Sequence, residues 1–164
     1  MESDRILMTT KANVFAARER SIQAIAHPIR LEGGEGEKAM RIHHVAIICS
    51  DYEQSKKFYV EVLGFPIIQE TFRKERNSFK LDLKVSETEQ IELFSFPNPP
   101  KRVNDPEACG LRHLAFEVDD IKASVSQLQA KGISVETIRI DEITGKKFTF
   151  FRDPDGLPLE FYEK

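Results

Sequence analysis

Apolar and polar positions after residue 40 fall into short patterned segments that predict a strand, a helix and three further strands. Residues 42–49 form an apolar run of the kind found in buried strands. The segment Ser50 to Glu53 has the spacing of a capping box, and Gly64 has the place of a helix C-cap. We therefore expect a helix between them, followed by strands at 66–72, 78–85 and 90–96.

The same order of elements recurs after a proline-rich stretch. A strand is predicted at 111–118, and Asp119-Asp120 opens a helix that ends at Gly132. Further strands are predicted at 133–139, 146–152 and 157–162. Two segments align without gaps, Ile-His-His-Val-Ala-Ile (42–47) and Leu-Arg-His-Leu-Ala-Phe (111–116), which are 69 residues apart. The repeat predicts an α+β fold of paired βαβββ modules whose sheets enclose a cleft.

The repeat also sets the expected domain boundaries. Residues 1–40 lie outside it; they hold a weakly periodic segment, 4–25, that could form a helix, and a Gly-rich linker before Met40. We interpret 1–40 as an extension or tag without an assigned function. The domain is expected at 41–164, with module 1 at about 41–97, a linker at 98–110 and module 2 at about 111–164.

Composition excludes several classes of function. The 164 residues include 24 Lys and Arg against 27 Asp and Glu, a net charge of −3, and no basic block suggests a nucleic-acid partner. The apolar runs are too short to span a membrane, and the N-terminus lacks the features of a signal peptide. Two cysteines, Cys49 and Cys109, make no disulfide framework, which favours reduced thiols and a cytoplasmic protein.

Each module carries a histidine in its first strand and a glutamate in its last. His44 and Glu92 are 48 residues apart, and His113 and Glu160 are 47 apart. Each glutamate stands between apolar neighbours, so alternation places it on the opposite sheet face from them. Any one of these residues is more often an ordinary surface or core residue. The matched pairs instead favour one shared divalent metal ion, because two imidazoles and two carboxylates balance its charge.

Four segments at these residues resemble the vicinal oxygen chelate superfamily, which includes glyoxalase I, extradiol dioxygenases and bleomycin resistance proteins. They are Ile-His-His-Val-Ala-Ile-Ile (42–48), Ile-Glu-Leu-Phe-Ser-Phe-Pro (91–97), Pro-Glu-Ala-Cys-Gly-Leu-Arg-His-Leu-Ala-Phe (106–116) and Phe-Thr-Phe-Phe-Arg-Asp-Pro-Asp-Gly-Leu-Pro-Leu-Glu (148–160). The resemblance covers about 42–162 and is closest to glyoxalase I-like bacterial metalloproteins. It implies paired βαβββ modules with a metal in the cleft, held by His44, Glu92, His113 and Glu160.

The resemblance also implies an activity. It suggests a metal-dependent lyase or isomerase of the lactoylglutathione lyase type, acting on a small substrate with vicinal oxygens through a metal-stabilised enediolate. Glu160 is the first choice of catalytic base and Glu92 the second. The implied ion is Zn, Ni, Co or Mn. A homodimer is expected, and whether one chain or two supply the ligands stays open. The alternatives are a dioxygenase or thiol transferase, or a non-catalytic binding or resistance protein.

Two positions differ from glyoxalase I and leave the substrate open. Ile48 stands where glyoxalase I has an arginine for the glutathione carboxylate, and Phe96 stands where it has an asparagine. Use of glutathione is therefore undecided. The candidates for substrate contacts are Phe96, Arg112 and Arg152.

Overall fold

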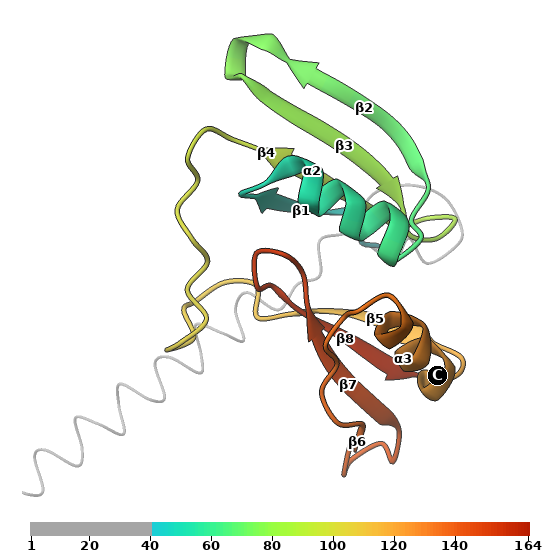
Figure 1. Cartoon of the computed structure of the whole chain (residues 1–164). Coiled ribbons are helices and arrows are strands. Elements are labelled where there is room, and N and C mark those ends of the chain that lie inside the picture. The colour runs from blue at the N-terminus through green and yellow to red at the C-terminus, as the bar shows by residue number, and fades with distance from the viewer. Residues whose placement is uncertain (1–40) are drawn as a thin grey trace, which may run out of the picture. The chain divides into compact units, whose positions relative to one another are not determined.

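The structure, a computed structural model, describes residues 41–164. The predicted helix at 4–25 and the rest of the predicted extension lie outside the described residues. Within the described part, each half follows the predicted order of a strand, a helix and three strands, which form two four-stranded mixed sheets (Figure 1). The predicted α+β fold of two βαβββ modules is confirmed.

The first module has the strand order β1-β4-β3-β2, with β1 parallel to β4 and the other pairs antiparallel. Helix α2 contacts β4. Its elements are β1 (His44–Cys49), α2 (Tyr52–Lys57), a π-helical turn (Phe58–Val62), β2 (Ile67–Arg73), a 3-10 turn (Lys74–Arg76), β3 (Ser78–Lys84) and β4 (Gln90–Ser95).

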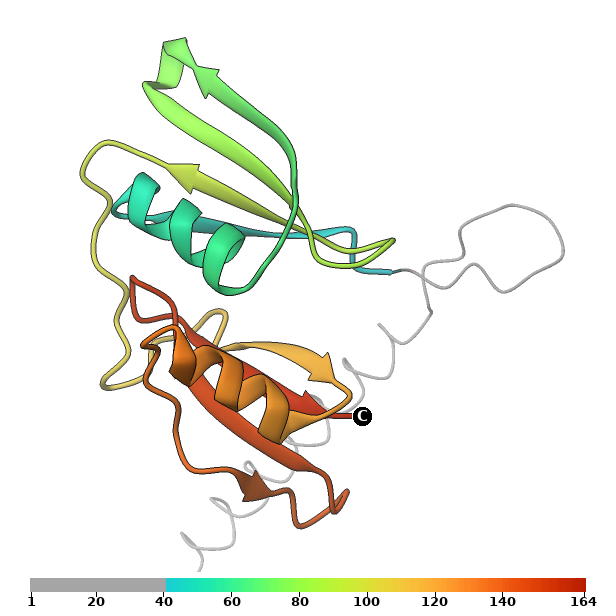
Figure 2. The same ribbon diagram turned by 45° about the vertical axis from the view of Figure 1, so that its right-hand side comes forward.

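The second module repeats this topology with the order β5-β8-β7-β6, in which β5 runs parallel to β8 (Figure 2). Helix α3 contacts β8. Its elements are β5 (Leu114–Val118), α3 (Ile121–Ala130), β6 (Arg139–Ile140), β7 (Lys147–Arg152) and β8 (Pro158–Glu163).

The core lies on one face of each sheet because the strands alternate as the sequence predicted. Ile91 and Leu93 of β4 are buried, whereas Glu92 between them has the opposite orientation and is partly exposed. In β8, Leu159 is fully buried. The helix α3 buries its predicted apolar face of Ile121, Val125 and Leu128. Glu92 and Glu160 lie on the opposite faces of their sheets, together with aromatic side chains such as Phe94 and Phe150.

The first helix differs from its prediction in its cap and its end. The side chain of Asp51, not Ser50, caps α2 by accepting a hydrogen bond from the Gln54 amide at 2.9 Å. The helix then widens into the π-helical turn Phe58–Val62 before Gly64. Ser50 is used elsewhere: its amide and hydroxyl both donate to the Asp155 carboxylate of the second module.

The predicted strand at 133–139 is wrong for most of its length. Val135 makes one isolated bridge to Phe151, and regular pairing is restricted to Arg139–Ile140. The Thr149 hydroxyl donates to the Glu136 carbonyl at 2.7 Å, so a side chain occupies an acceptor that a ladder would have used. The segment therefore follows β7 without forming a regular strand with it.

The strand predicted at 111–118 starts three residues later, at Leu114. The Arg102 guanidinium donates to the carbonyls of Leu111 and Arg112, the second at 3.1 Å. These carbonyls are thus bonded to the linker rather than to a neighbouring strand. His113 consequently lies directly before β5, at the point where the linker enters the sheet.

Hydrogen bonds near the turn at 153–156 join the two modules. The Tyr59 hydroxyl donates to Asp153 Oδ2 at 3.0 Å, and both side chains are buried. Asp153 Oδ1 accepts the amides of Asp155 and Leu157 at 3.0 and 2.7 Å. Burial raises the pKa of the Asp153 carboxyl above its usual range, although these hydrogen bonds lower it.

Replacing Asp153 with asparagine should remove the loss of stability that the natural protein undergoes as the pH rises. Because the folded-state pKa of Asp153 is raised, its contribution is present at low pH and is lost as pH rises through that pKa. The variant lacks this titration. The difference in free energy of unfolding, Asp153→Asn minus the natural protein, should therefore increase between acidic and neutral pH, by about 1.4 kcal/mol for each unit by which the pKa is raised. Urea unfolding across this range measures it. Asp119→Asn, at an exposed side chain, is the control, and the same trend in both variants would contradict the expectation.

Candidate metal and substrate site

Strand parity brings one histidine and one glutamate together in each module. In the parallel pair β1 and β4, Ala46 lies opposite Glu92, and in β5 and β8, Ala115 lies opposite Glu160. Each histidine is two residues before its alanine, and alternation gives it the same sheet face as the glutamate. Both alanines are exposed, whereas the two glutamate side chains are largely buried.

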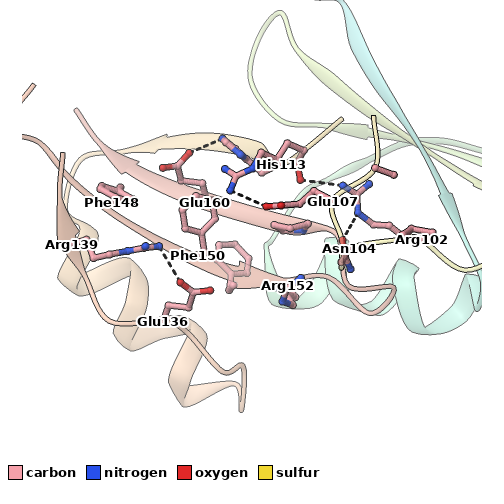
Figure 3. Close-up of a pocket in the computed structure, with 15 residues that line it drawn as sticks. Arg102, Asn104, Glu107, His113, Glu136, Arg139, Phe148, Phe150, Arg152 and Glu160 are labelled. Atoms are coloured by element: carbon pink, nitrogen blue, oxygen red, sulfur yellow. Dashed lines mark hydrogen bonds and ion pairs between the residues drawn. The ribbon is translucent and has the colours of Figure 1, made fainter. Parts of the chain in front are cut away.

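The pair in the second module is the more buried. His113 Nε2 lies 3.1 Å from Glu160 Oε2, and only 11% of the Glu160 side chain is exposed (Figure 3). The His113 ring meets Phe150 edge-on, with centroids 5.3 Å apart. Its Nδ1 atom is buried and has no hydrogen-bond partner among residues 41–164. A buried imidazole nitrogen without a partner is costly in an apoprotein and suits a site that takes up a ligand.

The pair in the first module is more open. His44 Nε2 lies 3.8 Å from Glu92 Oε2, and 43% of the His44 side chain is exposed. Lys80 Nζ lies 2.9 Å from Glu92 Oε1 and also contacts Asp82. Burial lowers the pKa of Lys80, but its hydrogen bonds to Asp82 and Glu92 outweigh this effect and raise it. Lys80 therefore balances the charge of Glu92 in the first module.

The two pairs remain separate in one chain. Within residues 41–164, no three His, Cys, Asp or Glu side chains gather closely enough to hold a metal ion. The edge strands β1 and β5 belong to different sheets and do not pair with each other. Each module therefore presents half of the predicted ligand set, one imidazole and one carboxylate.

A cavity of about 510 Å³ adjoins the pair of the second module. His113 and Glu160 line it, and two of the three candidates for substrate contacts, Arg112 and Arg152, line it as well. The third, Phe96, lies at the end of β4 in the first module, with its ring 6.2 Å from that of Phe94. The structure thus places Arg112 and Arg152 beside one half-site and Phe96 in the module of the other.

Several residues of this cavity were not anticipated from the sequence, and three of them lie around the His113–Glu160 pair. These three are Arg139, Phe148 and Phe150, all of which point into the region shown in Figure 3. Alternation along β7 would have identified the two phenylalanines, because Phe150 pairs with Glu160 in the register. Arg139 carried no such signal, since it is the last residue of the predicted strand 133–139, which is irregular for most of its length.

Both cysteines are free, as the sequence predicted, and Cys49 is buried whereas Cys109 is exposed. Burial raises the pKa of the Cys49 thiol to about 11, so Cys49 is a neutral core residue rather than a nucleophile. No helix within residues 41–164 has the length and apolar character needed to cross a bilayer.

Comparison with known proteins identifies the family to which this chain belongs. The profile of the Glyoxalase/Bleomycin resistance protein/Dioxygenase superfamily matches residues 41–161. The chain belongs to this superfamily, the vicinal oxygen chelate proteins.

Individual relatives differ in how much is known of them. The uncharacterized protein YwkD of Bacillus subtilis is 63% identical over 123 residues, which cover 75% of this chain and 96% of YwkD. A 2-epi-5-epi-valiolone epimerase of Actinomyces sp is 30% identical, covering 74% of this chain and 78% of the epimerase. The crystal structure of a glyoxalase family protein from Enterococcus faecalis has 51% identity and a TM-score of 0.71, covering 75% of this chain and 97% of that one.

Proposed function

We propose that this protein is a metal-dependent lyase or isomerase of the glyoxalase I type, acting on a small substrate with two adjacent oxygens. The observation that carries the proposal is the matched pairing of His44 with Glu92 and of His113 with Glu160, on equivalent faces of two repeated modules. The superfamily's name includes glyoxalases, and one relative is a 2-epi-5-epi-valiolone epimerase.

The donor set fits one divalent ion such as Zn, Ni, Co or Mn. Two neutral imidazoles and two carboxylates would balance its charge, and the buried Nδ1 of His113 has no hydrogen-bond partner within residues 41–164. We propose His44, Glu92, His113 and Glu160 as its ligands. When bound, such an ion stabilises negative charge that develops on neighbouring substrate oxygens.

The ligands are proposed to come from two chains of a homodimer. One chain keeps its His–Glu pairs apart within the described residues, so a module of a second chain would complete each site. Dimers are common in this superfamily. The partners are then a second copy and a small-molecule substrate, with no nucleic acid. Because its cysteines are free, we place the protein in the cytoplasm.

Glu160 is the proposed catalytic base. Its side chain is less exposed than that of Glu92, and it lines the cavity that would receive the substrate. There it would accept a proton from the carbon next to the substrate oxygens, and His113 would hold the carboxylate in place. Glu92, which already contacts Lys80, is the second choice.

Metal content and turnover test this proposal together. Elemental analysis of the purified protein should find close to one divalent ion per chain, and chelation followed by zinc should remove and restore activity. Activity is measured as thioester formation from the hemithioacetal of methylglyoxal and glutathione, and as deuterium exchange of small α-hydroxycarbonyl compounds by NMR. A protein that takes up no divalent ion would contradict the proposal.

A further inference from the structure

The cavity beside His113 and Glu160 has an aromatic wall with a positive rim. Phe148, Phe150 and Arg152 occupy alternate positions of β7, so they share the sheet face that carries Glu160. Arg139 lies opposite Phe148 in the register of β6 and β7. The guanidinium of Arg139 and the imidazole of His113 therefore lie around the same ring, that of Phe150 (Figure 3).

The Arg139 guanidinium is positioned by two ring contacts and one hydrogen bond. Its Cζ atom lies 4.9 Å from the Phe148 centroid and 5.4 Å from the Phe150 centroid. A cation over an aromatic face is held electrostatically, which leaves its N–H donors free for a ligand. In the described part of the chain, Arg139 donates one hydrogen bond, from Nη2 to Glu136 Oε2 at 3.0 Å.

This single ion pair is weak enough for a ligand to replace. The side chains of Arg139 and Glu136 are 51% and 54% exposed, and ion pairs between such exposed side chains contribute little to stability. The cavity also has an excess of positive charge. Four arginines line it (Arg102, Arg112, Arg139 and Arg152) against three glutamates (Glu107, Glu136 and Glu160). Such an excess attracts anions.

A second guanidinium, that of Arg73, also stacks on two phenylalanine rings, in the other module. Arg73 Cζ lies 4.7 Å from the centroid of Phe94 and 5.4 Å from that of Phe96, on or just beyond the strand that carries Glu92. Its Nε atom is buried without a hydrogen-bond partner among residues 41–164. Arg73 and Arg139 do not occupy equivalent positions of the repeat. Both half-sites nevertheless have a guanidinium stacked on two phenylalanine rings.

We propose that Arg139 binds an oxyanion of the substrate, a carboxylate or a phosphate ester, at the end of the cavity away from Glu107. The substrate is then an anionic small molecule whose carbon chain lies along Phe148 and Phe150. The position of its vicinal oxygens at His113 and Glu160 rests on the proposed function. Binding of the anion itself needs only Arg139 and the cavity.

Titration with two simple anions tests this site without requiring catalysis. Inorganic phosphate and malonate are each added to the full chain, zinc-loaded and zinc-free, and the shifts of backbone amides near Arg139 and Phe150 are followed by NMR. At least one of the two anions should bind to both the zinc-loaded and the zinc-free protein. The ratio of the affinities for phosphate and malonate distinguishes a phosphate from a carboxylate substrate. Arg139→Gln should weaken it about tenfold, the effect of losing a charge-assisted hydrogen bond.

Matched variants make the outcome decisive. Glu136→Gln should strengthen anion binding severalfold, because it removes the competing carboxylate while its backbone contacts remain. Arg139→Lys should restore part of the affinity, and Arg76→Gln, on the 3-10 turn of the other module, should change nothing. Anion binding that is absent, that ignores Arg139→Gln, or that occurs only with zinc would overturn the inference. Zinc uptake by Arg139→Gln should stay normal, which separates this result from the test of the metal site.

Discussion

Replacing Glu160 with glutamine should lower turnover by about 10²- to 10⁴-fold, the usual contribution of a positioned acid–base group. The amide has nearly the shape of the carboxylate but cannot accept a proton from carbon. It can still offer one oxygen to a metal, so bound zinc should be retained with reduced affinity. The burial of Glu160 against His113 makes this the position where loss of the base is most damaging.

The measurement is kcat for whichever substrate of the activity panel the zinc-loaded protein converts, together with zinc content by elemental analysis. Glu163→Gln is the matched control, since Glu163 lies three residues later on the same strand and pairs with Lys147 at 2.8 Å. Unchanged turnover in Glu160→Gln would exclude Glu160 as the base. A comparable loss in Glu92→Gln alone would transfer that role to Glu92.

Replacing either His44 or His113 with alanine should reduce zinc affinity by more than about 100-fold. Changes in groups that only support a metal ligand already cost about 10- to 100-fold, and removal of a ligand should cost more. The equal effect of the two changes is the informative part, because His44 is 43% exposed and His113 is 30% exposed. A structural role would make the more exposed residue much less sensitive.

Competition with a chromophoric zinc chelator gives these affinities. His43→Ala is the internal control: His43 directly precedes β1 and is not a proposed ligand, although its Nδ1 atom lies 3.0 Å from that of His44. A loss in His43→Ala as large as that in His44→Ala would show that the segment, rather than the ligand, is responsible.

Much of the fold followed from the sequence because the pattern of apolar residues was repeated. The offset that aligns His44 with His113 also predicted two modules with equal element order, and the structure has both. Strand predictions failed where a side chain donates a hydrogen bond to a backbone carbonyl that a neighbouring strand would otherwise use. Thr149 occupies the Glu136 carbonyl, and Arg102 occupies the carbonyls before His113. Such contacts join residues distant in sequence, and no local pattern indicates them.

For the candidate site, the sequence predicted a histidine early and a glutamate late in each module, and in the structure His113 Nε2 lies 3.1 Å from Glu160 Oε2. That these residues bind a metal ion stays a prediction. The sequence did not predict that the two pairs remain separate in one chain, because the repeat describes each module and not their association. Nor did the sequence predict that Arg139 lies in the cavity. Its stacking on Phe148 and Phe150 depends on the two-residue strand β6.

The separation of the pairs leads to the most direct test of the proposed metal site. His44→Ala and His113→Ala chains carrying different tags are mixed and refolded together, and the dimer with one of each is purified. If module 1 of one chain and module 2 of the other form each site, this dimer has one site with both histidines and one with neither. It should bind one zinc ion as tightly as the natural protein, whereas each variant alone binds none tightly. A mixed dimer that binds zinc no better than its two parents would contradict a metal site shared between two chains.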